Sequence, residues 1–135
     1  MRARDDDGAR PELIAALERH VQAFRTAFAD ERGLRLFFSP GRVNLMGAHL
    51  DYNGGPVMPM ALDRGTFVAM RPRADERITL ASTLEPESFS ASLTSLPTRP
   101  AGRWFDYPLG VVLRLLSQTR ETSGADVLFG GNLPI

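Results

Sequence analysis

The 135-residue sequence contains no cysteine and no lysine. Without cysteine the chain forms neither disulfides nor thiolate metal sites, which is typical of a reducing cytoplasm. All sixteen basic residues are arginine, a composition bias that excludes a lysine nucleophile or a Walker-type phosphate-binding lysine within this chain.

Net charge and long apolar runs are also absent. Sixteen acidic residues balance the sixteen basic ones, so charge gives no reason to expect nucleic acid or an anionic membrane as a partner. No apolar run approaches the roughly 20 residues of a membrane helix, and the start, Met-Arg-Ala-Arg-Asp-Asp-Asp, lacks a signal-peptide apolar region. We therefore expect a soluble, cytoplasmic protein of at most one domain, with residues 1–9 forming a disordered N-terminus.

Residues 39–55 are the most informative stretch of the sequence. Their glycines and proline favour a bent backbone that offers polar groups to a ligand. The imidazole and the carboxylate, two residues apart, suit the paired hydroxyls of a sugar. The polar side chains of this stretch are Arg42, Asn44, His49 and Asp51.

Alternation along an extended backbone predicts how this stretch is held. Val43 and Leu45 would enter a core while Arg42 and Asn44 face the other way. Gly47 then allows a sharp change of direction. If the chain stays extended after that glycine, the imidazole and the carboxylate share one side.

Residues 41–55 resemble the galactose-binding signature of galactokinases, which are GHMP small-molecule kinases. The family pattern is Gly-Arg-Val-Asn-Leu-Ile-Gly-Glu-His-Thr-Asp-Tyr-Asn-Gly-Gly, and twelve of its fifteen positions match. The resemblance implies ATP-dependent phosphorylation of the C1 hydroxyl of galactose, with Mg²⁺ carried on the ATP. We expect no metal site in this chain, since its two histidines, His20 and His49, lie far apart in the sequence. It implies that Arg42 stabilises the transition state, and that the substrate-binding positions are Asn44, Ala48, His49, Leu50 and Asp51.

Three positions depart from the pattern. Met46 replaces isoleucine, a volume-conserving exchange of core residues that should matter little, and Leu50 loses a hydroxyl. Ala48 stands where galactokinases have a glutamate that contacts the sugar near O6. A sugar with a C6 carboxylate would be repelled by glutamate and tolerated by alanine, and the Gly-Ala-His-x-Asp form also resembles galacturonokinases. The substrate therefore stays divided between galactose and galacturonate or another C6-modified sugar.

The remaining pattern predicts helices and strands around this site. Residues 11–30 form an amphipathic helix, with His20 on its solvated face and its apolar face made by Leu13, Leu17, Val21, Phe24 and Phe28. Strands are expected at residues 34–38, 66–70, 77–81, 89–93 and 125–130, and an edge or irregular segment at 56–62. Residues 66–70 and 77–81 should form a hairpin, whose solvated end carries Arg71 and Arg73 rather than a phosphate-binding patch.

A second helix is expected to open after residue 103 and end near Gly124, with Asp106 as its N-cap and Pro108 in its first turn. Its start resembles the Arg-Trp-Ala-Asn-Tyr-Val-x-Gly-Val segment of galactokinases. The resemblance implies that Trp104, with Arg103 and Tyr107, binds the nucleotide by lying against adenine. A tryptophan buried in the core is the equal alternative.

The fold class predicted for residues 10–135 is α+β. The resemblance implies a mainly antiparallel sheet with helices on one face, as in the N-terminal domain of GHMP kinases and the second domain of ribosomal protein S5. The chain looks like the N-terminal third of a kinase, whose phosphate loop and catalytic aspartate lie in a C-terminal remainder. We therefore expect no turnover from this chain alone and poor cover for Val127, Leu128 and Phe129. A non-catalytic sugar-binding protein or pseudoenzyme remnant is the alternative.

Overall fold

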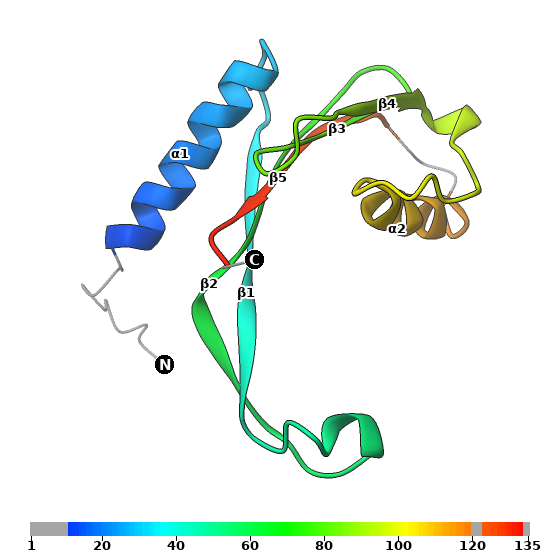
Figure 1. Ribbon diagram of the computed structural model, residues 1–135. Helices are drawn as coiled ribbons and strands as arrows, with labels where there is room; N and C mark the ends of the chain where they lie inside the picture. Colours follow the sequence, from blue (N-terminus) through cyan, green and yellow to red (C-terminus); the bar gives the residue numbers. More distant parts are fainter. Residues whose placement is uncertain (1–10, 120–122, 134–135) are drawn as a thin grey trace, which may run out of the picture.

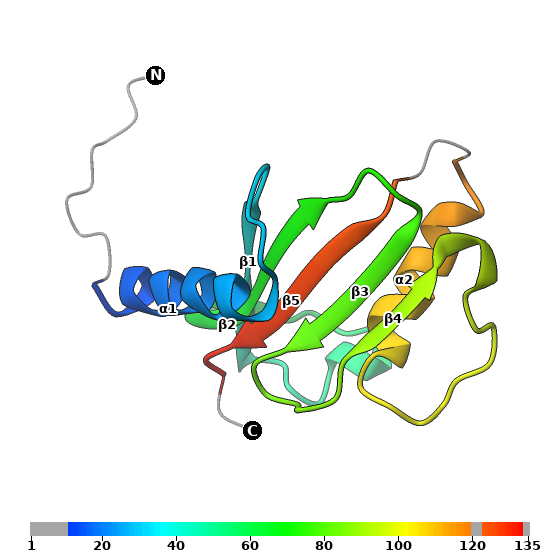
Figure 2. The ribbon, with the colours of Figure 1, turned by 90° about the horizontal axis from the view of Figure 1, so that it is seen from above.

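The computed structural model describes residues 11–119 and 123–133, so the predicted disordered segment 1–9 lies outside the described residues. Five strands form one sheet in the order β1-β2-β5-β3-β4 (Figures 1 and 2). The elements are α1 (Pro11–Ala27), β1 (Arg35–Met46), a 3₁₀ turn (Asp51–Asn53), β2 (Met58–Pro72), β3 (Arg77–Ser82), β4 (Phe89–Ser92), a second 3₁₀ turn (Leu93–Ser95), α2 (Asp106–Leu116) and β5 (Ala125–Gly131).

The sheet is mainly antiparallel, which confirms the predicted fold class; only β3 and β5 pair in parallel. The predicted hairpin of residues 66–70 and 77–81 is wrong, because β5 lies between β2 and β3. The connection between them crosses the start of β5, where Gly124 accepts a hydrogen bond from the Arg73 N–H (2.8 Å) and donates one to the Asp75 carbonyl (2.7 Å). A Cβ at Gly124 would lie 2.2 Å from the Arg77 carbonyl oxygen, so this crossing requires glycine.

The two helices cover opposite faces of the sheet, so the expectation of helices on one face is wrong (Figure 1). On one face Val127 of β5 packs with Leu109 of α2, and on the other Leu128 packs with Phe24 of α1. Neighbouring residues of a strand point to opposite faces, so a central strand with consecutive apolar residues needs cover on both. The predicted exposure of Val127 and Leu128 is therefore also wrong: both are buried, and Phe129 is half-buried.

Helix α1 confirms the predicted amphipathic helix, but the middle of its buried face is a residue that was predicted to be exposed. His20, predicted to be solvated, is 4% exposed, and its Nε2 lies 3.1 Å from the Leu128 carbonyl oxygen. Ala16 and Phe24, one turn before and after it, are buried as well. The face of α1 that packs on β2 and β5 thus contains Ala16, His20 and Phe24. The imidazole can be buried there because it is hydrogen-bonded.

Helix α2 begins and ends differently from the prediction. Phe105 occupies the N-cap position and the helix ends at Leu116, well before Gly124; residues 120–122 lie outside the described part. Asp106 is the first helical residue and caps no amide of the helix. Its carboxylate instead accepts hydrogen bonds of 2.8–3.1 Å from the backbone N–H groups of the preceding loop, residues 101–103. These bonds lower the pKa of Asp106 below its ordinary value.

Arg71 and Arg73 do not form a solvated hairpin end. Both pair with Asp126 of β5, whose side chain is only 1% exposed. Arg71 also pairs with Asp30 (2.8 Å) and Arg73 with Asp75 (2.7 Å). The two arginines therefore belong to a partly buried ion-pair network that joins β2 to β5 and to the segment after α1.

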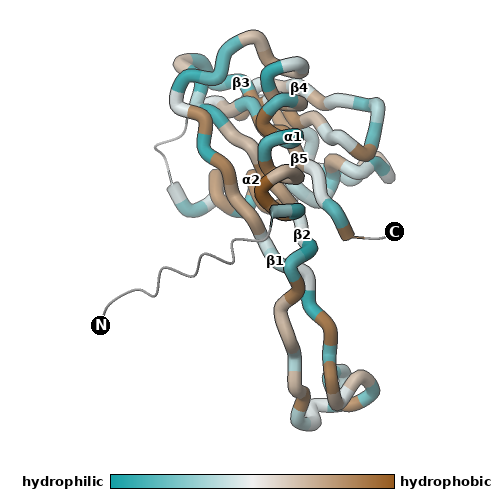
Figure 3. Tube along the Cα trace, turned by 90° about the vertical axis from the view of Figure 1, so that its left-hand side faces the viewer, coloured by the Kyte–Doolittle hydropathy of each residue, from teal (hydrophilic) through white to brown (hydrophobic). Residues whose placement is uncertain are grey.

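Strands β1 and β2 extend beyond the rest of the sheet as a projecting arm, residues 41–65 (Figures 1 and 3). Strand β5 pairs with β2 only from Thr66 onward, so the predicted edge character of residues 56–62 is confirmed. The predicted burial of Val43 and Leu45 is wrong, since they are 40% and 55% exposed, and Met46 is 71% exposed. Leu45 lies within a register shift between Asn44 and Met46, and in this part of the chain the arm has no second layer to pack against.

Candidate functional site

The tip of the arm is a tight turn built on glycine. Gly47 has a φ of +86°, which confirms the predicted change of direction, and a Cβ there would lie 2.6 Å from the Pro56 carbonyl oxygen. The Leu50 N–H donates to the Gly47 carbonyl, and the Gly55 N–H donates to the Leu50 carbonyl, both at 2.8 Å. The chain after Gly47 is therefore a turn followed by the 3₁₀ turn Asp51–Asn53, not the extended segment expected.

Despite this different backbone, the turn brings three of the predicted sugar-binding residues into one hydrogen-bonded group. Asp51 accepts from the Asn44 side-chain amide (3.4 Å) and from the Tyr52 backbone N–H (2.7 Å). His49 Nδ1 lies 3.2 Å from the Tyr52 hydroxyl, and the Asn53 side-chain amide donates to the His49 carbonyl at 2.9 Å. We call Asn44, His49, Asp51, Tyr52 and Asn53 the tip cluster.

Tyr52 and Asn53 were not predicted as site residues from the sequence. Their signal was nonetheless present, because both belong to the Asp-Tyr-Asn-Gly-Gly end of the matched pattern. Their side chains orient His49 from two sides, one at the ring and one at the backbone. They therefore support the geometry of the tip.

Arg42 lies on β1, two residues before Asn44. The register between β1 and β2 is continuous from Arg42, opposite Ala61, to Asn44, opposite Pro59. Residues two apart on a strand point to the same face, so Arg42 and Asn44 share one face of the arm as predicted. The guanidinium is exposed, and Ala48 and Leu50 are exposed in the turn beyond it.

The chemistry available at the arm is hydrogen bonding by one carboxylate, one imidazole and two amides, with a guanidinium nearby. Such a mixture of donors and acceptors suits a polyhydroxylated ligand. Among residues 11–119 and 123–133, no three His, Cys, Asp or Glu side chains are grouped to hold a metal ion. In the same part of the chain, no helix has the length and apolar character needed to cross a membrane.

The predicted nucleotide-binding residues lie together at the start of α2. Arg103, Trp104 and Tyr107 line one open cavity of about 580 Å³. The Trp104 indole N–H donates to the Glu87 carbonyl at 2.9 Å, and its ring meets Phe105 edge-on with centroids 5.9 Å apart. Trp104 is thus half-buried, packs against the core and also lines the cavity.

The arm tip bends toward the face of the sheet that carries α2 (Figures 1 and 2).

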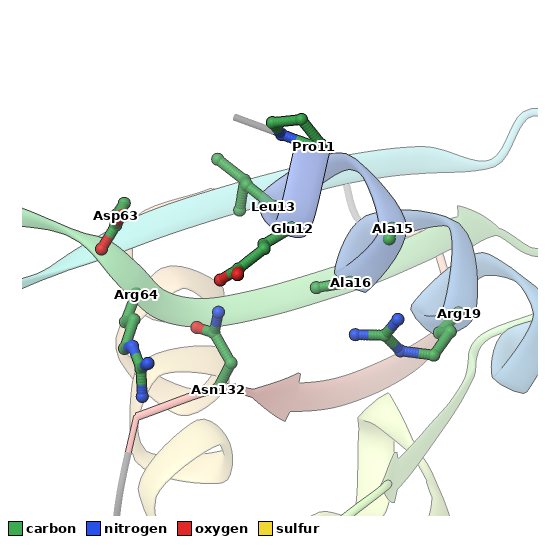
Figure 4. A pocket seen from close by; sticks show the side chains of 9 residues that line it. All are labelled: Pro11, Glu12, Leu13, Ala15, Ala16, Arg19, Asp63, Arg64 and Asn132. Carbon is green, nitrogen blue, oxygen red and sulfur yellow. The ribbon is translucent and has the colours of Figure 1, made fainter. Parts of the chain in front are cut away.

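A cavity of about 740 Å³ lies on the other side, between the start of α1 and β2 (Figure 4). Its lining carries charges of both signs and includes none of the predicted site residues. The polar side chains that line it are Glu12, Arg19, Asp63, Arg64 and Asn132.

Comparison with known proteins finds a family signature that includes the arm. A family profile described as the galactokinase galactose-binding signature matches residues 22–72, which include the whole tip cluster. The chain is 43% identical over 104 residues to a galactokinase of Clostridium tetani, covering 77% of this chain and 26% of that protein. It is 37% identical to a galactokinase of Halalkalibacterium halodurans over 123 residues, 90% of this chain and 31% of that protein. The chain therefore spans about a quarter to a third of the length of these relatives.

Solved structures resemble the fold as well. Lactococcus lactis galactokinase complexed with galactose superposes with a TM-score of 0.74 and 32% identity, covering 91% of this chain and 31% of that one. Methanococcus jannaschii mevalonate kinase gives a TM-score of 0.64 over 75% of this chain and 33% of that one, at 19% identity, a likeness of fold alone.

The fold is that of the GHMP small-molecule kinases. Within that class the chain belongs to the galactokinase family, and its residues 22–72 match the galactose-binding signature of that family.

Proposed function

We propose that the chain is the sugar-binding part of a sugar 1-kinase that transfers the γ-phosphoryl group of ATP to the C1 hydroxyl of galactose. The observation that carries this proposal is the tip cluster, in which Asn44, His49 and Asp51 are hydrogen-bonded into one group on the same arm as Arg42. The likeness to a galactokinase complexed with galactose supports the choice of sugar. A cytoplasmic location is part of this proposal, because a sequence without cysteine is typical of a reducing compartment.

Sugar recognition would rest on the oriented polar groups of the tip. Asp51 is held by Asn44 and by the Tyr52 N–H, and its carboxylate oxygens keep lone pairs for sugar hydroxyls. When the Tyr52 hydroxyl donates to His49 Nδ1, the proton of the neutral imidazole is on Nε2, which then donates to the ligand. A fixed acceptor beside a fixed donor distinguishes sugars by the orientation of their hydroxyls.

Arg42 would act on the phosphoryl group rather than on the sugar ring alone. Phosphoryl transfer needs alignment and charge neutralisation more than covalent chemistry. A guanidinium beside the C1 hydroxyl offsets the negative charge that spreads over the γ-phosphoryl oxygens in the transition state. Mg²⁺, where bound to the ATP phosphates, supplies further charge neutralisation.

Adenine is proposed to occupy the cavity lined by Arg103, Trp104 and Tyr107. Trp104 is fixed by its hydrogen bond to Glu87, so its position is set before a nucleotide binds. The phosphate-binding loop and the catalytic base would come from a C-terminal remainder of the kinase. On this proposal the 135-residue chain binds sugar and has no turnover by itself.

Galacturonate, or another sugar modified at C6, is the second candidate substrate. Ala48 favours it, because this exposed turn position carries neither a charge nor a hydrogen-bond acceptor. The polar groups of the tip cluster are compatible with either sugar.

The test is a comparison of galactose and galacturonate as substrates of the full-length protein, with ADP formation and the ³¹P spectrum of the product as readouts. We expect sugar-dependent ADP formation and a phosphate on C1 of the sugar. Sugar binding without phosphorylation would favour a non-catalytic sugar-binding protein. Neither binding nor turnover with either sugar would refute the proposal.

A further inference from the structure

The root of the arm, where β1 and β2 leave the sheet, contains an unusual strand pairing. The last regular pair between β2 and β5 is Thr66 with Gly131, so Gly65 comes to face Asn132. The Asn132 backbone N–H donates to the Gly65 carbonyl at 3.1 Å. The Gly65 N–H donates at 2.8 Å to the side-chain oxygen Oδ1 of Asn132. In a regular antiparallel pair, the backbone carbonyl of the facing residue would accept that bond.

The Asn132 carboxamide therefore takes the place of a backbone carbonyl. Because the side-chain oxygen accepts this bond, the chain can leave β5 after Gly131 while the buried Gly65 keeps a partner for its N–H. Without that oxygen the Gly65 amide would be left unpaired in a place that water does not easily reach, a costly state for a backbone group. Figure 4 shows the Asn132 side chain directed from the end of β5 toward β2.

Three strands meet closely at this point. A Cβ at Gly65 would lie 2.1 Å from the Ser39 carbonyl oxygen of β1. The next residue after Asn132 reaches β1 as well, since a Cβ at Gly41 would lie 2.7 Å from Leu133 Cδ2. The register between β1 and β2 shifts between Pro40 and Arg42, at this same level. Asn132 and Leu133 thus contact both strands of the arm where its direction is set.

We infer that Asn132 is a positioning residue for the arm: its side-chain oxygen holds Gly65 and thereby fixes the direction in which Arg42 and the tip cluster are presented. Arg42 lies just beyond the shift in register, so a change at the root would be transmitted to it along a two-stranded ribbon with few other supports. The predicted consequence for sugar affinity rests on the proposed function. The predicted consequence for the direction of the arm does not.

The first test measures the arm itself. The sequence lacks cysteine, so the substitutions Glu18→Cys on the outer face of α1 and Met58→Cys on the exposed arm give two unique sites for spin labels. Double electron–electron resonance then reports the distance between α1 and the arm. We expect Asn132→Ala to shift or broaden this distance distribution, and Asn132→Asp, which keeps an acceptor for the Gly65 N–H, to retain the parent distribution.

Leu109→Ala in the α2 core is the matched control, because it lowers stability away from the root. It should leave the distance distribution unchanged under conditions where the protein is folded. An unchanged distribution in Asn132→Ala would overturn the inference. A change of equal size in Asn132→Ala and Asn132→Asp would also overturn it, since the acceptor would then be irrelevant.

The second test measures galactose affinity of the same variants by calorimetry. We expect about a tenfold loss in Asn132→Ala, the size typical of a buried amide left without its partner, and recovery in Asn132→Asp. If the parent protein binds no sugar, the proposed function fails while the distance measurement still decides the role of Asn132. An unchanged affinity in Asn132→Ala would contradict its role in presenting the sugar site.

Discussion

Replacing Asp126 with asparagine should destabilise the protein more than any exposed charge substitution in the same network. Asp126 is 1% exposed and pairs with Arg71 at 2.6 Å and with Arg73 at 3.0 Å. Removing one partner of a buried ion pair costs roughly 3–5 kcal/mol, because the remaining charges are left desolvated. Each arginine keeps a second carboxylate, Asp30 or Asp75, so we expect the lower end of that range, about 3 kcal/mol.

Urea unfolding of the parent chain and the Asp126→Asn variant measures this loss, provided that the slope of free energy against urea is unchanged. The control is Asp75→Asn, which removes a carboxylate whose side chain is 54% exposed and should cost less than about 1 kcal/mol. A loss in Asp126→Asn no larger than that of the control would refute the view that burial makes this network important for stability.

Three further predictions concern the site and one buried histidine. Arg42→Ala in the full-length protein should reduce turnover far more than sugar affinity, as expected for an interaction made mainly in the transition state; equal losses in both would instead indicate a residue that holds the sugar. Ala48→Glu should shift preference toward galactose over galacturonate in competition assays, and an unchanged ratio would remove the argument about C6. Burial lowers the pKa of His20 below its ordinary value of 6.5, an effect partly offset by its hydrogen bond to Leu128. Because the unfolded chain then binds the proton more tightly than the folded one, the free energy of unfolding should fall as pH drops below 6.5. His20→Gln keeps a side-chain donor and should show a weaker dependence of the free energy of unfolding on pH. An identical pH dependence in both proteins would contradict the assignment to His20.

Local features of the chain were predictable from sequence. The bend at Gly47 follows from the conformational freedom of glycine, and its φ of +86° confirms it. The helix at residues 11–27 and the edge character of residues 56–62 follow from periodicity and proline. Asn44, His49 and Asp51 were identified through the matched pattern, although Asp51 lies on a 3₁₀ turn where an extended chain was expected.

Pairing over long sequence distances was not predictable in this way. The burial of His20 depends on a hydrogen bond to the Leu128 carbonyl, and Leu128 lies more than a hundred residues later in the chain. The insertion of β5 between β2 and β3 depends likewise on the close approach at Gly124. Asp126 gave a signal that could have been used: a lone carboxylate within an apolar strand needs cationic partners. Arg71 and Arg73 were in the sequence to supply them.

The exposed apolar residues of the arm show a second limit of prediction from sequence. Alternation along a strand predicts which residues share a face, and not whether anything covers that face. In the described part of the chain β5 ends before it can support the arm. Exposure at this site is therefore a consequence of how the strands end.

Titration of the isotopically labelled chain with galactose, followed by amide chemical shifts, is the most direct test of where the sugar binds. The proposed site predicts saturable shifts at Asp51, Tyr52 and Asn53 and at the Arg42 side chain. Shifts confined to the cavity beside α1, at Arg19 and Arg64, or no shifts at all, would contradict it.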